Sequence, residues 1–287
     1  MNWILASALM FISSVVLYLF VRKSTLLKTP SQFNNLAMFI VPLIVYLIMV
    51  GITHANMNVN FYEFLIILVS AIFFSYFGNV FSLKGIEYAP NPGYSLVLSK
   101  SYVLFTTVAA IFLFKADLSW GQATAIILIV IASALIMITK KSQEKSHVRV
   151  SWLPLSIGSF FCWGFLSLSS KYLLILGVSI LARLTYLIAI VTILILLEMR
   201  HKKIRWKTLT KEQMMVLICT GLLSASFNYF MQVGFNTAPN IGYVNAVNAA
   251  SIGAVSFFSA LIFRDELTKQ KMLGIIGVTL GLILLVI

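Results

Sequence analysis

The stretch GIEYAPNPGY, from Gly85 to Tyr94, returns 149 residues later as GFNTAPNIGY, from Gly234 to Tyr243. Six positions match in register, namely Gly, Ala, Pro, Asn, Gly and Tyr. The same offset holds far upstream, where Trp3 falls on Trp152. A match of this length at one fixed offset indicates an internal duplication rather than a shared turn motif.

The duplication continues toward the C-terminus. IFLFKADLS, residues 111–119, falls on ALIFRDELT, residues 260–268, so that a cation, an acid, Leu and a hydroxyl recur in order. One constant offset therefore covers the chain. It predicts two copies, residues 1–138 and 150–287, joined by a polar linker at residues 139–149.

Composition places both copies in a membrane. Of the 287 residues, 60% are hydrophobic and 10% are charged, whereas soluble globular chains carry roughly 25% charged residues. This excludes a soluble domain. Ten apolar runs, each about long enough to cross hydrocarbon as a helix, fall at 2–21, 35–53, 62–84, 93–114, 119–139, 152–170, 178–198, 213–235, 242–263 and 268–287. We therefore predict an all-α membrane protein with ten transmembrane helices.

Each copy holds five of these runs. Because five is odd, the second copy must enter the membrane in the opposite orientation to the first. The predicted fold is thus two inverted five-helix repeats. Such repeats, related by a pseudo-twofold axis in the membrane plane, are typical of secondary transporters, whose substrate sites lie near the bilayer midplane.

The basic residues predict the orientation, since cytoplasmic loops are enriched in Lys and Arg. The odd-numbered loops hold 17 of the 21 basic residues, and the even-numbered loops hold Lys115 and Lys171. The 17 are Arg22, Lys23, Lys28, Lys84, Lys140, Lys141, Lys145, Arg149, Arg200, Lys202, Lys203, Arg205, Lys207, Lys211, Arg264, Lys269 and Lys271. We expect both termini on the non-cytoplasmic side of a bacterial inner (plasma) membrane. Topology thereby accounts for most of the +13 net charge, and no nucleic-acid partner is expected.

The run FFSALIFRDELTKQKMLGIIGVTLGLILLV, from Phe257 to Val286, resembles the closing helix pair of EamA-type members of the drug/metabolite transporter superfamily. Glu266, Gly274, Gly277 and Gly281 match the pattern of that family. Through the duplication the resemblance spans the whole chain. The sequence departs from the family pattern in the fourth and ninth helices, where many members carry a proline and this chain has none. The resemblance implies transport by alternating access, with cargoes that range from amino acids and nucleotide-related metabolites to cationic drugs, sugars and lipid-linked sugars.

The sequence contains no catalytic or metal-binding pattern. It has no GxGxxG after a strand, no Walker sequence and no HExxH, and neither Cys162 nor Cys219 lies beside an acid or a histidine. We therefore expect no enzymatic activity, no cofactor and no metal. The expected partners are the lipid bilayer and a small-molecule substrate, and the sequence carries no information on oligomeric state.

Lys100 is the clearest ionisable residue predicted inside the membrane. It follows Pro92 by eight residues, which at 1.5 Å per residue places it roughly 12 Å into a hydrocarbon core of roughly 30 Å. Its counterpart in the second copy is Ala249, so the fold does not require this charge twice. Either Lys100 faces a cavity and binds a carboxylate or phosphate, or it snorkels to the interface or donates to backbone carbonyls.

Four asparagines are further candidates for substrate binding. Asn245 and Asn248 share a face of the ninth predicted helix, which enters the membrane from the opposite side, so that Asn248 is expected near the depth of Lys100. This pair either hydrogen-bonds a polar cargo or holds helices together. Asn79 and Asn228 occupy equivalent places in the third and eighth helices, which suggests a symmetric structural contact as readily as a site.

The remaining candidates are aromatic or hydroxylated. Tyr94 and Tyr243 each follow a Pro-Asn-X-Gly turn, where they either line the site or anchor a helix end at the interface. Trp163 shares a stripe of the sixth helix with Ser167 and other serines. Either Trp163 closes over a substrate, or the small residues of the stripe permit tight helix packing.

The acidic residues are informative by their position, because all eight are predicted in loops or at helix ends. Proton-coupled carriers usually titrate a group in mid-membrane, so a proton-coupled exporter of cationic drugs is disfavoured. Glu63 and Glu87 remain as candidates for proton coupling. Arg183, near an outer helix end, is expected to be a snorkelling anchor.

These patterns favour a secondary transporter that moves a small polar metabolite, either anionic or zwitterionic, such as an amino acid or an organic anion. Two alternatives on the same fold stay open. A non-transporting scaffold or regulatory subunit predicts that Lys100 and Asn248 face lipid or a dry helix interface. A flippase for lipid-linked head groups needs a lateral opening between helices.

Overall fold

The computed structural model describes residues 1–89, 92–138, 151–204 and 209–287. Over these ranges ten helical segments are long and apolar enough to cross a membrane, which confirms the predicted number of spans. The predicted linker at 139–149 lies outside the described residues. So do Pro90 and Asn91 of the first repeated turn, and the cations between 139 and 150 and between 205 and 208.

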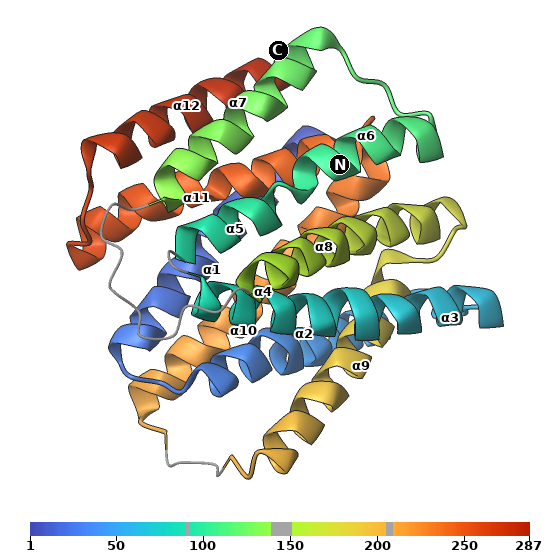
Figure 1. Cartoon of the computed structure of the whole chain (residues 1–287). Helices are drawn as coiled ribbons and strands as arrows, with labels where there is room; N and C mark the ends of the chain where they lie inside the picture. Colours follow the sequence, from blue (N-terminus) through green and yellow to red (C-terminus); the bar gives the residue numbers. More distant parts are fainter. Residues whose placement is uncertain (90–91, 139–150, 205–208) are drawn as a thin grey trace.

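The helices follow one another along the chain with short connections (Figure 1). The first half contains α1 (Trp3–Leu26), α2 (Ser31–Thr53), α3 (Phe61–Val69), the π-helical segment η1 (Ser70–Tyr76), α4 (Phe77–Tyr88), α5 (Pro92–Lys100), α6 (Tyr102–Phe114) and α7 (Trp120–Met137). The second half contains α8 (Trp152–Ile175), α9 (Ile180–His201), α10 (Lys211–Thr237), α11 (Ile241–Phe263) and α12 (Lys269–Val286). Within the first half, α3, η1 and α4 form one membrane-length segment, and α5 and α6 form another.

Side-chain caps explain where several helices begin. Asn60 and Glu63 form a capping box at the start of α3, Ser119 and Gln122 form one at α7, and Thr210 with its partner three residues on forms one at α10. In each box the side chain of the cap residue accepts a hydrogen bond from an otherwise unpaired backbone N–H, and the side chain three residues on accepts one from the backbone N–H of the cap residue. Polar residues at the ends of apolar runs therefore set these boundaries.

Left-handed residues mark where several helices and turns end, and they recur with the offset of the sequence repeat. In the described chain the residues with positive φ form three pairs that lie 149 positions apart: Lys28 and Gly177, His54 and Lys203, and Lys115 and Arg264. Gly177 closes α8 through backbone bonds from Gly177 to Leu174 and from Val178 to Leu173, the Schellman arrangement that favours glycine at this position. The two halves thus turn at equivalent positions.

Helix packing follows a matching pattern. α1 packs against α10 and α11, and α8 packs against the segment from α3 to α4 and against α5 and α6. α12 lies beside α7 at one edge of the molecule, and α2 lies beside α9 toward the other (Figure 1). α11 crosses the middle and contacts α6 and α7. Two hydrophobic clusters fill the interior, one around α7 and α11 and one around α2 and α9.

The bundle has two ends, which we call the Arg22 end and the Gly177 end. At the Arg22 end, Gln213 donates from Nε2 to the Leu27 carbonyl at 3.0 Å. At the Gly177 end, the Tyr243 hydroxyl donates to the Asp117 carbonyl at 2.8 Å. Side chains therefore connect helix ends that lie far apart in the sequence.

Candidate functional site

Lys100 lies where the fourth membrane helix is interrupted. It is the last residue of α5, and Ser101 forms a turn before α6 begins. The Ser101 hydroxyl donates to the Val97 carbonyl at 2.7 Å, and the Ser101 backbone N–H donates to the same carbonyl at 3.0 Å. A serine that bonds back to the preceding turn distorts a helix, which accounts for a break in a segment that has no internal proline.

Side chains from three helices gather around Lys100. Its ammonium group lies within electrostatic range of the phenol groups of Tyr18 on α1 and Tyr102 on α6. Tyr102 in turn hydrogen-bonds Asn248 and donates to Asn245 Oδ1 at 3.4 Å, both on α11. We call these five residues the Lys100 cluster. The structure therefore brings Lys100 and Asn248 together, with Tyr102 between them.

The charge of Lys100 has no acidic counterpart. The ion pairs among the described residues do not include it, although a charge inside a membrane usually pairs with another or faces a cavity. Beside Lys100 is a cavity of only about 10 Å³, lined by residues of α5 and α7, by Ser101 and by Ala249. That is room for one water molecule at most. This cavity is therefore too small for a metabolite.

Two of the predicted asparagines already have hydrogen-bond partners. Asn245 is fully buried, and its Nδ2 donates to Thr106 Oγ1 at 3.0 Å, which ties α11 to α6. Asn228 donates from Nδ2 to the Ser224 carbonyl at 2.8 Å within its own helix, α10. Asn79 is half-buried on α4. Among the described residues, no hydrogen bond joins Asn79 or Asn228 to the Lys100 cluster.

The other candidates are placed outside the cluster. Trp163 on α8 packs beside Gly78 of α4, and Ser167 donates to the Trp163 carbonyl at 3.1 Å. Tyr94 is 43% exposed, whereas Tyr243 is buried and its hydroxyl reaches Gln122 Oε1 at 2.7 Å. Tyr243 ties the start of α11 to the connection between α6 and α7 and to the first turn of α7, and its burial differs from that expected of an aromatic anchor at the interface.

A larger cavity, of about 370 Å³, opens at the Gly177 end. It lies between the turn that joins α8 to α9 and the last turns of α10. Its lining residues are Ala55, Leu174, Gly177, Val178, Ser179, Ile180, Leu181, Tyr229 and Asn236. This volume lies in the range of small-molecule sites, whereas that of the cavity beside Lys100 does not.

Arg183 differs from its predicted role. A snorkelling side chain keeps its charge in water, but Arg183 is only 2% exposed and lies inside the bundle. One of its terminal nitrogens, Nη2, donates to the Ser170 hydroxyl of α8. Its position near the start of α9 had suggested the interface. The prediction is wrong because this face of α9 is turned toward α2, α8 and α10 rather than toward lipid.

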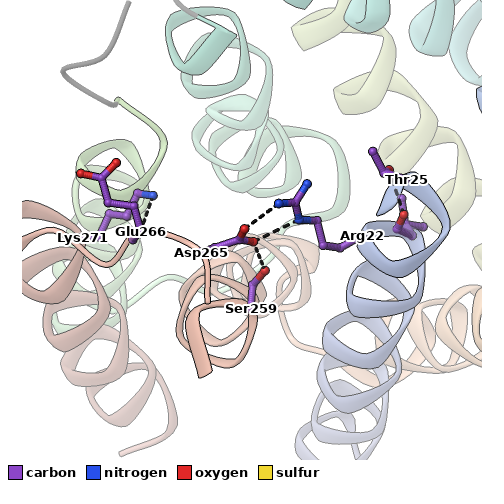
Figure 2. Close-up of polar contacts among 7 residues, drawn as sticks. Arg22, Thr25, Ser259, Asp265, Glu266 and Lys271 are labelled. Carbon is purple, nitrogen blue, oxygen red and sulfur yellow. Dashed lines mark hydrogen bonds and ion pairs between the residues drawn. The ribbon is translucent and has the colours of Figure 1, made fainter. Parts of the chain in front are cut away.

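The Arg22 end is closed by ionic contacts (Figure 2). Arg22 of α1 donates to Asp265 through two nitrogens, at 3.1 and 2.5 Å, and the Ser259 hydroxyl donates to the same carboxylate at 2.5 Å. The bond from Arg22 holds the pKa of Asp265 below its ordinary value, and Ser259 adds to this effect. A two-point arginine–carboxylate contact fixes geometry as well as charge, so α1 is tied to the connection between α11 and α12.

Sequence reasoning missed Tyr18 and Tyr102. Tyr102 is two residues beyond Lys100, and its hydroxyl joins the lysine region to α11. The sequence alone could have indicated Tyr102, because a tyrosine within one helical turn of a lysine in a membrane span is able to place its hydroxyl near the lysine. Tyr18 has no such signal, because its approach to Lys100 depends on how α1 packs against the rest of the bundle.

Comparison with protein-family models gives no match, and comparison with curated proteins gives none either. The fold itself does occur among solved structures. One of them, described only as "Crystal structure of protein", superimposes with a TM-score of 0.77 at 10% sequence identity. The match covers 97% of this chain and 96% of that one. At this identity the likeness concerns the fold alone.

Proposed function

We propose that the protein is a secondary transporter of the drug/metabolite type, with an EamA-like pair of inverted five-helix repeats. Its cargo is a small polar metabolite, anionic or zwitterionic, that crosses by alternating access. The observation that carries the proposal is Lys100, a cation with no acidic partner among the described residues. It lies at a helix interruption and connects through Tyr102 to α11. Broken helices near the midplane are where transporters of inverted-repeat type bind substrate.

Several structural pairs support the inverted repeat. The left-handed residues recur 149 positions apart, and the packing of α1 on α10 has its counterpart in that of α8 on η1 and α4. With five spans in each copy, equivalent helices run in opposite directions through the membrane. By the positive-inside rule the Arg22 end is cytoplasmic and the Gly177 end faces the other side.

The two ends differ in a way that fits one state of such a cycle. The Arg22 end is closed by the contact between Arg22 and Asp265, while the Gly177 end has an open cavity. In the duplication Asp265 corresponds to Ala116 and Arg22 to Lys171. The Gly177 end therefore lacks the acid that would form the equivalent ion pair. Because only the Arg22 end has this ionic contact, the state open at the Gly177 end, which is the outward-facing state, is favoured. In the cycle, the two repeats would rock about the midplane so that Lys100 meets each side of the membrane in turn.

The scaffold hypothesis keeps one specific observation in its favour, which is the water-sized cavity beside Lys100. In that reading the cluster is a dry helix contact and transports nothing. The two functions differ in one measurable quantity, the flux of solute across a membrane that contains the purified protein.

The first step of the test is to find a cargo. The thermal unfolding of the purified chain is measured with amino acids, nucleotides, organic anions and quaternary amines, since a ligand that binds the folded state raises the unfolding temperature. We expect stabilisation by an anionic or zwitterionic compound. Stabilisation by cations alone would contradict the charge argument.

The second step measures uptake of that compound into proteoliposomes. Lys100→Ala is expected to abolish uptake and to leave the amount of folded protein unchanged, because it removes the charge that binds the cargo. Lys115→Ala, an exposed cation outside the cluster, serves as the control and should transport normally. Unchanged uptake by Lys100→Ala would remove Lys100 from the site, and no uptake by the unmodified protein of any stabilising compound would favour the scaffold.

A further inference from the structure

We infer that Arg183, beneath the cavity at the Gly177 end, is a second anion-binding group, which receives the carboxylate or phosphate of a small molecule with an apolar body. This site is separate from the Lys100 cluster. As a statement about cargo it rests on the proposed function, but as a binding site it stands on the following observations.

The first observation is that the charge of Arg183 is buried without an acid. The side chain is 2% exposed, no ion pair among the described residues includes it, and its Nε has no hydrogen-bond partner there. Its contact is with the neutral hydroxyl of Ser170. Burying a charge in this way is costly unless an opposite charge joins it. An arginine that presents unfilled donors in a fixed plane is suited to a carboxylate or a phosphate.

The second observation is the position of Arg183 relative to the cavity. Ser179 and Ile180 line the cavity, and Arg183 follows them by four and three residues on α9, so it lies one turn below them on the same face. Its partner Ser170 precedes the lining residue Leu174 by four residues on α8. Two helices therefore bring Arg183 and Ser170 to a level one turn from the cavity lining, with the Arg183 backbone about 6 Å along α9 from that of Ser179.

A third helix approaches the same point. Tyr229 of α10 lines the cavity and lies within electrostatic range of Tyr46, which in turn lies within that range of Arg183. On the same side of α10, between Tyr229 and Asn236, Gln232 is 5% exposed and its Oε1 has no partner among the described residues. An unfilled donor and an unfilled acceptor thus each lie within one helical turn of residues that line the cavity, and the acceptor is suited to receive an N–H or O–H of the same ligand.

The start of α9 adds to this arrangement. α9 begins at Ile180, with Ser179 as its cap, at the wall of the cavity. The N-terminus of a helix carries a partial positive charge and unpaired N–H groups, which favour an anion nearby. Together with Arg183 it provides positive potential from one side of the cavity. The rest of the wall is mainly aliphatic, from Leu174, Val178 and Leu181, so the ligand needs an apolar body as well as a charge.

The test uses purified full-length protein in detergent, with benzoate and phenyl phosphate as probes and benzamide as the neutral analogue of benzoate. At about five times its dissociation constant, a bound anion should raise the unfolding temperature by about 2–4 °C, and benzamide should not. The two anions also distinguish carboxylate from phosphate. No shift with either anion, or an equal shift with benzamide, would overturn the inference.

Arg183→Met retains the length of the side chain and removes its charge. We expect about ten- to hundred-fold weaker binding of the anion, the loss of a charge-assisted hydrogen bond. We also expect an unliganded unfolding temperature equal to or above that of the unmodified protein, because an unpaired buried charge is gone. If Arg183 had only a structural role, Arg183→Met would instead lower the unfolding temperature and leave binding of the anion unchanged. Lys115→Met, which removes an exposed cation, should bind as the unmodified protein does.

Ile180→Trp keeps the inference testable if Arg183→Met does not fold. It fills the cavity from a half-buried wall position and leaves Arg183 in place, so it should remove the thermal shift with benzoate. A retained shift would place the anion elsewhere and overturn the inference. Binding without any flux in proteoliposomes would contradict only the transporter, whereas flux with unaltered binding in Arg183→Met would contradict only this site.

Discussion

Asparagine side chains have two different structural roles in this bundle. Asn245 bonds across to Thr106 and receives a bond from Tyr102, so it joins α11 to α6. Asn228 bonds back to Ser224 within α10. Only the first kind of contact contributes to the association of helices, and hydrogen bonds between membrane helices average about 0.6 kcal/mol with a maximum of about 1.7.

Replacement of these two residues should therefore have unequal effects. We expect Asn245→Ala to lower the free energy of unfolding by about 1–2 kcal/mol, because it also leaves buried partners unsatisfied. Asn228→Ala should change it by less than about 0.5 kcal/mol. Thermal unfolding in one detergent compares the two. A larger loss for Asn228→Ala would show that its bonds within the helix matter more than the contact between helices.

Residue identity alone predicted which side chains lie close together better than the direction in which a side chain points. The sequence predicted that Lys100 and Asn248 lie near each other, and the structure connects them through Tyr102. The direction in which Arg183 points could not be predicted, because α9 is apolar around much of its circumference and the pattern does not mark the face that is buried. Burial of Arg183 is a property of the packed helices.

At the scale of the elements, glycines allow α12 to approach α7 closely. A Cβ placed on Gly274 would lie 2.5 Å from Ile136 Cγ1 and 2.7 Å from the carbonyl oxygen of Ala132, and one on Gly281 would lie 2.5 Å from Ile129 Cγ1. These are contacts that real side chains do not make, and one of them is with backbone. The two glycines therefore determine the separation of this helix pair.

We expect Gly274→Ala to destabilise the protein by about 1–3 kcal/mol, since α12 must move away from α7. Gly51→Ala is the matched control. A Cβ at Gly51 of α2 would have no atom within 4 Å, so the same substitution there should be neutral or stabilising by about 0.5–1 kcal/mol. Thermal unfolding measures both. Equal effects at the two positions would mean that helix propensity, rather than the close approach of α12 to α7, determines the change in stability.

The number of helices was predictable from the sequence, but their irregularities were not. Ten apolar runs separated by charges, Gly or Pro suffice to count spans. The turn at Ser101 and the π-helical segment from Ser70 to Tyr76 have no proline or glycine to mark them. Both depend on hydrogen bonds that are formed only in the folded chain, such as those of Ser101 with Val97 and of Ser70 with Ser169.

At the scale of the whole molecule, the contact between Arg22 and Asp265 is expected to keep the Arg22 end closed. We predict that Asp265→Asn opens it. Spin labels at Leu26→Cys and Ile262→Cys, both exposed positions near this end, would report a second, longer distance in a background in which Cys162 and Cys219 are replaced by Ser. The reason is the loss of a two-point ionic contact between α1 and the connection after α11.

The neighbouring pair of Lys23 and Glu212, at 3.0 Å, is about half-exposed on both sides and serves as the control. Exposed pairs of this kind contribute little, so Glu212→Gln should leave the distance distribution unchanged. An unaltered distribution in Asp265→Asn would show that packing alone closes this end.

The pH dependence of this contact follows from its pKa. The carboxyl group of Asp265 has a lowered pKa in the folded protein because Arg22 and Ser259 donate to it. Its stabilisation is complete above the ordinary pKa of about 3.9 and is lost as the pH falls through the lowered value. The distances between spin labels at positions 26 and 262 should therefore stay constant between about pH 5 and pH 8. We expect that acidification within the physiological range does not open the Arg22 end.

The π-helical segment η1, from Ser70 to Tyr76, distinguishes the third membrane span from the eighth, which is α10. The span from Phe61 to Tyr88 has 28 residues, whereas α10 has 27, and π-helical turns take up a surplus residue without breaking the helix. Deletion of one codon in this segment is thus the change that would leave a continuous α-helix behind. The deletion would also rotate Asn79 and the residues after it, as far as the next turn, about the helix axis. A gene that had lost that codon would therefore encode a regular helix whose side chains face the wrong neighbours.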